Sequence, residues 1–255
     1  MPTALRAVLP HLFDDAGLFP PAKLPMAEAL AAHQRALAGP HREVVGPFLC
    51  PATRLDELDA CVASGAVRPT ALGIIGYAGQ LDWRRPMAVR GVVQAEAPIG
   101  AGMPVPPGRI VRYLELPHRG AIGPALDDVM RASARAKVRC GGLTDDAIPT
   151  VEWLAEVLVG CVERGLQLKA TAGLHHAFRA GRREPPRHGF VNLLAAAAVA
   201  RSRATVGEVA AVLAAEEADA SDLPGRVAGA RELLTSIGTC SIDEPLGELA
   251  VRGLL

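Results

Sequence analysis

The sequence has little lysine and no excess of either charge. Among its 255 residues, 27 are basic and 27 are acidic, so the formal net charge is zero. Only Lys23, Lys137 and Lys169 are lysines, and every other basic residue is an arginine. Proteins that bind nucleic acid or anionic membranes need an excess of positive charge to meet phosphate, so the balance argues against both classes. Because lysine does chemistry that arginine does not, each lysine position is a candidate for function.

Paired cysteines and long apolar runs are lacking as well. The five cysteines stand at wide, irregular spacings without a CxxC pair, which argues against a disulfide framework and against a zinc ribbon. The longest apolar run, residues 193–200, is far shorter than the roughly 18 residues that span a bilayer. No basic-then-apolar leader opens the sequence. We therefore expect a soluble cytoplasmic protein with buried thiols.

The dominant pattern is an apolar strand followed by a turn and an amphipathic helix. Strands are expected over residues 6–12, 44–50, 71–77, 92–96, 110–116, 137–141, 166–173 and 234–241. Helices are expected over residues 26–38, 55–64, 123–134, 151–164, 190–201 and 246–255. Strands that alternate with helices of this length indicate parallel pairing through right-handed crossovers. Eight such units in about 250 residues predict an α/β fold, a single (β/α)8 TIM barrel over residues 1–255.

The main rival fold is a doubly wound open sheet that binds a nucleotide. It is disfavoured because no glycine-rich fingerprint follows the first predicted strand, where the sequence continues with DDAGLFPP. The connection between the seventh and eighth strands, residues 174–233, is about twice as long as the others. It holds a basic loop over 178–188 and two predicted helices, over 205–217 and 224–234. The barrel is therefore expected to carry a long helical insertion there.

Polar side chains alternate with apolar ones in two neighbouring predicted strands. If the apolar positions of the seventh strand face the surrounding helices, Lys169, Thr171 and His175 point into the barrel. The same alternation in the sixth strand turns Lys137 and Arg139 inward. Because neighbouring strands lie about 5 Å apart, two of the three lysines are expected to enter one cavity side by side.

Further polar residues are expected at the same end of the barrel, where the active sites of TIM barrels lie. They are three carboxylates near strand ends and three histidines after the seventh strand: Asp14, Glu96, Glu115, His175, His176 and His188. Two cysteines, Cys140 and Cys240, are expected to face the outer helices instead. A barrel interior is normally packed with branched apolar side chains, so this much polarity predicts a ligand or a reaction.

The favoured hypothesis assigns the chemistry to lysine. A lysine in a dry site beside another cation has a lowered pKa, and its neutral amine can attack a carbonyl group to form a Schiff base. Lys169 would be this nucleophile, with Lys137 or Arg139 as the second cation. The groups expected to move protons or to lie near the reacting oxygen are Glu96, Glu115 and His175.

The residues around both lysines resemble a known enzyme family. The run KATAG, residues 169–173, resembles the strand of the deoxyribose-phosphate aldolases that carries the Schiff-base lysine. The run KVRCGG, residues 137–142, resembles the second lysine strand of that family, although the two strands occur here in the opposite order. The resemblance implies a class I, aldolase-like TIM barrel in which Lys169 is the amine and Lys137 is its perturbing neighbour.

A small anionic carbonyl compound is the expected substrate, and a lyase reaction that makes or breaks a carbon–carbon bond is the expected activity. Arg139 offers a fork of donors to a carboxylate or phosphate, and Gly173 lets backbone N–H groups approach an anion. The other expected substrate contacts are Asp14, Thr171, His176 and His188. No nucleic-acid or membrane partner is expected, and a homodimer is compatible with the Ala-rich helices.

Two alternatives stay open at this point. No cofactor is required by the favoured scheme, but His175 or His176 could hold a divalent metal together with carboxylates such as Glu96 or Glu115. The sequence contains no HxH or HExxH spacing that would strengthen this metal-assisted lyase or isomerase reading. In the second alternative, the polar residues form a buried ion network in an inactive barrel that serves as a binding or scaffold subunit.

Overall fold

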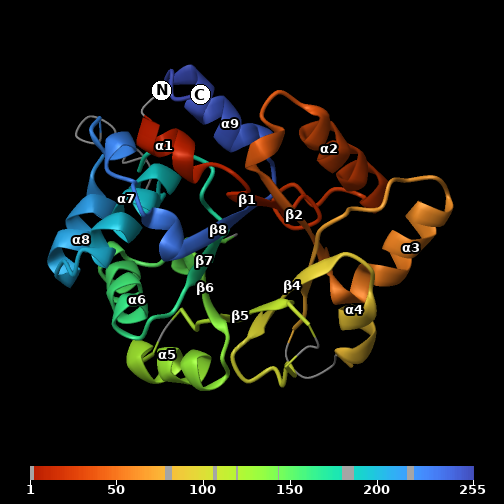
Figure 1. Ribbon diagram of the computed structural model, residues 1–255, viewed down its shortest axis with the longest axis horizontal. Helices are drawn as coiled ribbons and strands as arrows, with labels where there is room; N and C mark the ends of the chain where they lie inside the picture. Colours follow the sequence, from red (N-terminus) through yellow and green to blue (C-terminus); the bar gives the residue numbers. More distant parts are fainter. Residues whose placement is uncertain are drawn as a thin grey trace.

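The computed structural model describes residues 3–77, 82–105, 108–118, 120–142, 144–179, 187–216 and 221–255. Within them, eight parallel strands form a closed barrel in chain order, and β8 pairs with β1 to complete the ring. Helices surround this ring, as the ribbon shows (Figure 1). The predicted (β/α)8 TIM barrel is confirmed.

The strands are short, and all of their pairings are parallel. They are β1 (Phe13–Asp15), β2 (Val45–Pro51), β3 (Leu72–Ile75), β4 (Val92–Pro98), β5 (Val111–Glu115), β6 (Arg135–Arg139), β7 (Leu168–Thr171) and β8 (Leu234–Thr239). Seven of them overlap strands expected from the sequence, because they hold short apolar runs or, in β6 and β7, apolar residues that alternate with polar ones.

The helices alternate with the strands around most of the barrel. They are α1 (Thr3–Val8), α2 (Met26–Ala38), α3 (Leu55–Ala63), α4 (Arg84–Ala88), α5 (Ile122–Arg131), α6 (Val151–Glu163), α7 (Phe190–Arg201), α8 (Val206–Ala214) and α9 (Asp243–Val251). The bounds of α2 and α7 are those expected from the sequence. The apolar run of residues 193–200 is part of α7, where Leu193, Leu194 and Ala195 are fully buried.

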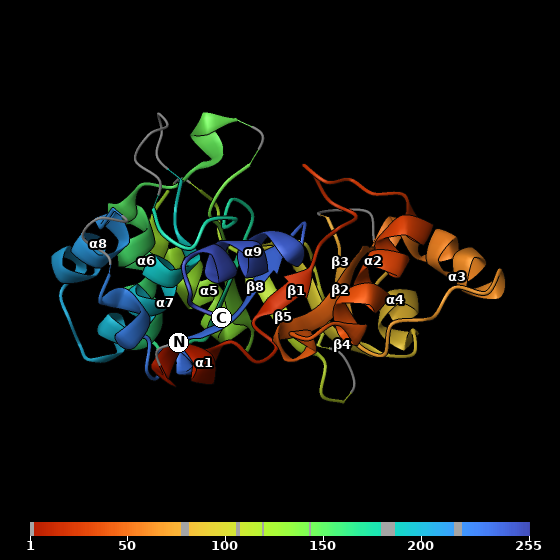
Figure 2. The ribbon, with the colours of Figure 1, turned by 90° about the horizontal axis from the view of Figure 1, so that it is seen from above.

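The prediction of the first strand is wrong. Residues 6–12 were expected to be extended, but Thr3–Val8 forms α1, and the first strand begins only at Phe13. The apolar residues Leu5, Val8 and Leu9 are buried at a spacing of three and four, which is the period of a helix rather than of a strand. Figure 2 shows α1 on the side of the barrel opposite the long loops. As a result, Asp14 lies within β1 and not after it.

The insertion between β7 and β8 is present, but only part of it is helical in the expected way. Helix α8 begins after Thr205, whose side chain accepts a hydrogen bond from the backbone of Glu208 in a capping box. The helix expected over 224–234 is wrong: Leu223–Gly225 and Ala230–Glu232 are separate 3-10 turns. Gly229 lies between the two turns and has a positive φ of 76°, a conformation that a regular helix does not continue through. Of the basic loop over 178–188, residues 180–186 lie outside the described residues.

Strand register brings the two lysines together. Lys137 of β6 is the direct pairing partner of Lys169 of β7, and Glu115 of β5 is the partner of Lys137. Because all three residues occupy the same side of adjacent parallel strands, their side chains enter the barrel at one level. Among the described helices, none has both the length and the apolar character needed to cross a bilayer.

Candidate active site

A cavity of about 510 Å³ opens at the carboxyl ends of the barrel strands. One part of its wall is apolar and comes from β2, β3 and the loop after β1: Phe19, Pro20, Pro21, Leu49, Ile75 and Tyr77. The opposite part is polar and comes from β4 to β7 and the loop after β7: Glu96, Glu115, Lys137, Arg139, Thr171, His175 and His176. The cavity therefore suits a ligand with one apolar and one charged end.

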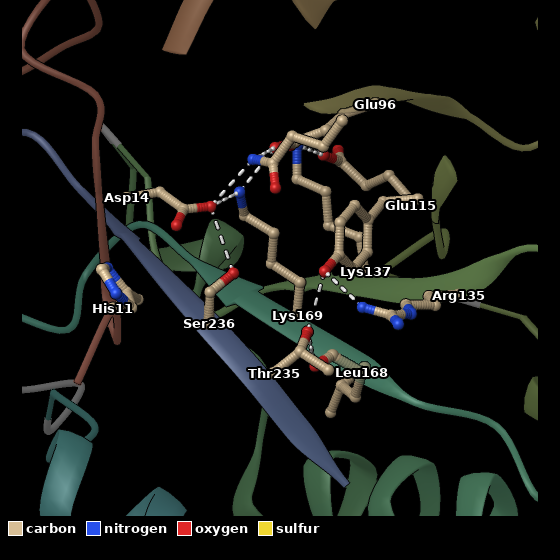
Figure 3. A network of polar contacts seen from close by, with 12 residues as sticks. His11, Asp14, Glu96, Glu115, Arg135, Lys137, Leu168, Lys169, Thr235 and Ser236 are labelled. Atoms are coloured by element: carbon tan, nitrogen blue, oxygen red, sulfur yellow. Dashed lines mark hydrogen bonds and ion pairs between the residues drawn. The ribbon is translucent and has the colours of Figure 1, made fainter. Parts of the chain in front are cut away.

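Lysines and carboxylates alternate in a chain of ion pairs inside the barrel (Figure 3). The amino group of Lys169 donates to Asp14 and, at 2.6 Å, to Oε1 of Glu96. The other oxygen of Glu96, Oε2, lies 2.7 Å from Nζ of Lys137. Lys137 Nζ also lies 3.0 Å from Oε2 of Glu115, whose side chain is 22% exposed. Three carboxylates thus face two amines, and the chain ends at the cavity with Glu115.

Neutral polar groups contact the end of this chain that lies away from the cavity, at Asp14 and Lys169. Gln94 donates from Nε2 to Oδ2 of Asp14 at 2.9 Å and to Oε1 of Glu96 at 3.2 Å. Ser236 donates from Oγ to the same oxygen of Asp14 at 3.1 Å. The ring of Tyr113 lies 5.5 Å from Nζ of Lys169, a separation typical of a cation–π contact. Lys169 is therefore surrounded by partners on several sides.

The electrostatics of the lysines differ from the sequence-based expectation. Burial alone would lower the pKa of Lys169, but the charges of Asp14 and Glu96 outweigh burial and raise that pKa above its usual value of 10.5. Burial likewise opposes the charge of Lys137, while Glu96 and Glu115 raise the pKa of that lysine. The expectation of a lowered lysine pKa is wrong, because the nearest charges are carboxylates rather than a second cation.

Glu96 occupies the centre of the chain and is ionised. Burial by itself would raise the pKa of Glu96, but the charges of Lys137 and Lys169 and their hydrogen bonds together lower it to about 2. With both of its oxygens used by lysines, this carboxylate acts as a fixed negative charge between two positive ones.

Arg139 carries positive charge into the cavity. Its side chain lines the cavity wall, and within the described part of the chain it has neither a salt bridge nor a hydrogen bond. Arg187, at the far end of the basic loop, also lines the cavity and lies 3.8 Å from Asp145. Thr171 is next to Arg139 in the paired strands, so a hydroxyl and a guanidinium face the same space.

Two glycines allow the ends of β6 and β7 to approach closely. Gly173 has a positive φ of 71°, and a Cβ atom there would lie 2.8 Å from the carbonyl oxygen of Cys140 and 2.9 Å from Cα of Gly141. A side chain at Gly173 would therefore force the two strand ends apart. Gly173 and Gly142 line the cavity, so part of its wall there is backbone.

The adjacent histidines after β7 both face α9. Nδ1 of His175 is in contact with Oε2 of Glu244, and Nδ1 of His176 lies 3.6 Å from Oε1 of Glu248. Glu248 also accepts a hydrogen bond of 3.1 Å from the backbone of Ala177. Both histidines line the cavity. The first two turns of α9 therefore fix the position of this loop.

Three residues expected at the site do not line the cavity. Lys169 and Asp14 are almost fully buried within the ion-pair chain. His188 is buried, and its Nε2 lies 2.8 Å from the carbonyl oxygen of Pro149, while burial lowers its pKa. These three side chains are placed to position their neighbours and do not form the cavity wall.

Some residues of the cavity and of the ion-pair chain were not predicted from the sequence. Cys240 was expected to face the helices, but it lines the cavity because it follows the last residue of β8, where strand alternation no longer holds. Ser236 could have been found, since alternation along β8 turns it inward as it does Lys169 in β7. Tyr77 and Phe19 carry no comparable signal, because each lies in a loop.

The expected metal ligands are not brought together. Asp14, Glu96 and Glu115 are engaged by lysines, and in the described part of the chain they form no metal-binding group with His175 or His176. The one group of potential ligands among the described residues is a different set, made of His175, Cys240 and Glu244.

Comparisons with known proteins gave no match of any kind. No protein-family model, no curated protein and no solved structure matches this chain. A TIM barrel supports many different reactions, so the fold alone favours an enzyme without indicating which one. The function has to be argued from the residues of the cavity.

Proposed function

We propose that this barrel is an enzyme that forms a covalent imine between Lys137 and a small anionic carbonyl compound, in a lyase reaction of the aldolase type. The observation that carries the proposal is the position of the Lys137 amino group. It lies in the cavity wall, between the carboxylates of Glu96 and Glu115, at 2.7 and 3.0 Å. TIM-barrel active sites occupy this end of the barrel.

Accessibility selects Lys137 over Lys169 as the reacting amine. Lys137 lines the cavity, whereas Lys169 has no exposed surface and is bound by Asp14 and Glu96. A nucleophile has to come within about 3–3.5 Å of the carbon that it attacks, which a fully enclosed amine does not do. We therefore exchange the roles that the family resemblance implied: Lys137 becomes the amine and Lys169 its positioning neighbour.

The raised pKa of Lys137 is compatible with imine formation. The protonated imine carries one positive charge on the same nitrogen as the ammonium group, so the conversion does not change the net charge. The carboxylates of Glu96 and Glu115 that stabilise the ammonium therefore also stabilise the protonated imine. Their effect is to keep the imine protonated, which makes it a strong electron acceptor.

Glu115 is the group placed to move the protons. Lys137 first gives one proton to Glu115, and its neutral nitrogen attacks the carbonyl carbon. The carbonyl oxygen then leaves as water with two protons, one shifted from the nitrogen and one returned by Glu115. Cleavage of the neighbouring carbon–carbon bond sends its electron pair to the imine, and Glu115 takes the hydroxyl proton of the departing carbonyl fragment.

The cavity wall favours a substrate with two different ends. Arg139, which has no partner among the described residues, is available for a carboxylate or phosphate on the charged side. On the other side, Phe19, Leu49 and Tyr77 offer apolar surface to the rest of the molecule. A small keto acid or phosphorylated aldehyde with an apolar chain or ring would place its charged group near Arg139 and its apolar part on the apolar wall.

Reductive trapping tests the proposed reaction. The protein is incubated with each member of a panel of aldehydes and keto acids and is then reduced with borohydride. The mass of the intact protein is measured by mass spectrometry. We expect a gain equal to the mass of one carbonyl compound less one oxygen atom, at one site per chain. No gain in mass with any member of a broad panel would contradict the proposal.

The substitution Arg139→Gln tests the anion-binding end. We expect trapping of an anionic keto acid to need a concentration at least about tenfold higher, because a charge-assisted hydrogen bond contributes more than about 1.5 kcal/mol. Trapping of a neutral aldehyde of similar size serves as the control and should change little. Equal losses for both compounds would show that Arg139 does not recognise the charge.

A further inference from the structure

A second group of reactive side chains lies at the edge of the same cavity. A ring nitrogen of His175, Sγ of Cys240 and a carboxylate oxygen of Glu244 all lie within 4.8 Å of one another. They come from the loop after β7, the residue that follows β8 and the first turn of α9. None of the three is part of the ion-pair chain around Lys137.

We propose that His175, Cys240 and Glu244 bind a divalent transition-metal ion of the zinc type. Imidazole nitrogen, thiolate sulfur and carboxylate oxygen are the three kinds of ligand that zinc takes in proteins. Two ligands on one tetrahedral zinc ion lie about 3.5 Å apart, given bond lengths of about 2.0–2.3 Å. The three candidate ligand atoms lie within 4.8 Å of one another, and the contact between His175 and Glu244 has to open to admit the ion, which the half-exposed side chain of Glu244 allows.

A simple ion pair between His175 and Glu244 explains the arrangement less well. Nδ1 of His175 is buried and, within the described residues, lacks a hydrogen bond of good geometry, even though Glu244 is in contact with it. A pair of this kind also has no need of a thiol, yet Cys240 completes the group. A metal ion would satisfy the nitrogen, the sulfur and the carboxylate together.

The surrounding contacts hold the ligands in place. The hydroxyl of Thr239 donates to the carbonyl oxygen of Ser241 at 2.8 Å, which fixes the backbone on both sides of Cys240. The backbone of Glu244 donates to Oγ of Ser241 at 3.3 Å. On the other side, Glu248 holds the backbone of Ala177 close to α9. Supporting contacts of this sort position the ligands of metal sites.

The expected coordination leaves a place for an exogenous ligand. Three protein ligands are typical of zinc sites that bind water or substrate in the fourth position. Because His175 and Cys240 both line the cavity, an ion held by them lies at the cavity wall. It would bind an oxygen of a small anion there. Metal binding itself does not depend on the reaction proposed for Lys137.

Cobalt(II) provides the direct test, because a thiolate ligand gives it a charge-transfer absorption band. Protein treated with a chelator is titrated with Co²⁺, and we expect one ion per chain, a thiolate-to-cobalt band and displacement of that band by Zn²⁺. Cys240→Ser should abolish the band, while Cys61→Ser on α3 should keep it. Glu244→Gln should weaken binding more than about tenfold.

Three results would overturn the proposal. One is the absence of a thiolate-to-cobalt band at saturating Co²⁺ in protein that circular dichroism shows to be folded. The second is a band that persists in Cys240→Ser, and the third is Co²⁺ binding that is equally strong in Glu244→Gln; either of these would assign the metal to other residues.

Discussion

Replacing Glu96 with glutamine is expected to lower the free energy of unfolding at pH 7 by about 3 kcal/mol. The pKa of Glu96 lies at about 2 instead of 4.5, and each pKa unit corresponds to about 1.36 kcal/mol of differential stabilisation. Removing one partner of a buried ion pair costs about 3–5 kcal/mol, which agrees with this figure. In Glu96→Gln, two buried lysines share the carboxylates of Asp14 and Glu115 alone.

The effect of Glu96→Gln should depend on pH in a defined direction. A carboxyl group with a lowered pKa in the folded state stabilises the protein fully above its unfolded pKa, near 4.5. That contribution disappears as the pH falls through the folded value of about 2. The difference in stability between wild type and variant should therefore be constant near neutrality and shrink between pH 4.5 and 2. Thermal and urea unfolding at several pH values measure it.

An exposed ion pair supplies the control for this stability prediction. Glu57 lies 2.6 Å from Nε of Arg54, and its side chain is 45% exposed. Surface pairs of this kind contribute under about 1 kcal/mol, so Glu57→Gln should leave the unfolding temperature nearly unchanged. If Glu96→Gln were as stable as Glu57→Gln at pH 7, the central role of Glu96 in the ion-pair chain would be wrong.

Replacing Lys137 with arginine is expected to abolish imine formation while the fold is kept. Arginine places a positive charge between Glu96 and Glu115, but a guanidinium does not form an imine under these conditions. With a carbonyl compound that the trapping panel identifies, the rate of turnover should fall at least about 10³-fold, since the covalent nucleophile is lost. Intact-mass measurement after borohydride treatment and a steady-state assay both report the result.

The stability of Lys137→Arg distinguishes a lost nucleophile from a damaged site. An unfolding temperature within a few degrees of wild type, together with complete loss of the adduct, is the expected combination. A variant that is folded and still trapped at the wild-type rate would show that a different amine reacts.

Strand alternation predicted much of the site from the sequence. The period of two in β6 and β7 correctly turned Lys137, Arg139, Lys169 and Thr171 into the barrel, because parallel barrel strands present alternate residues to the interior. The eight-unit pattern likewise gave the barrel itself. The error at residues 6–12 arose because a short apolar segment is read equally well as strand or helix.

The direction of the lysine pKa shifts could not be predicted in the same way. The sign of the lysine pKa shift depends on which charges lie nearest in space, and Asp14 and Glu96 come from strands far from Lys169 in the sequence. The sequence also could not predict which lysine lines the cavity. Lys137 and Lys169 are direct pairing partners and both point inward, but only Lys137 forms part of the cavity wall. The contact between His175 and Glu244 could not be predicted either, because it joins a loop to a distant helix and no sequence spacing indicates such a contact.

The identity of the trapped lysine tests the central claim most directly. After borohydride reduction with a carbonyl compound from the panel, proteolysis and tandem mass spectrometry locate the modified residue. We predict that the reduced adduct is on Lys137, with Lys169 and Lys23 unmodified. An adduct on Lys169, or one confined to Lys23, would contradict the assignment of Lys137 as the reacting amine.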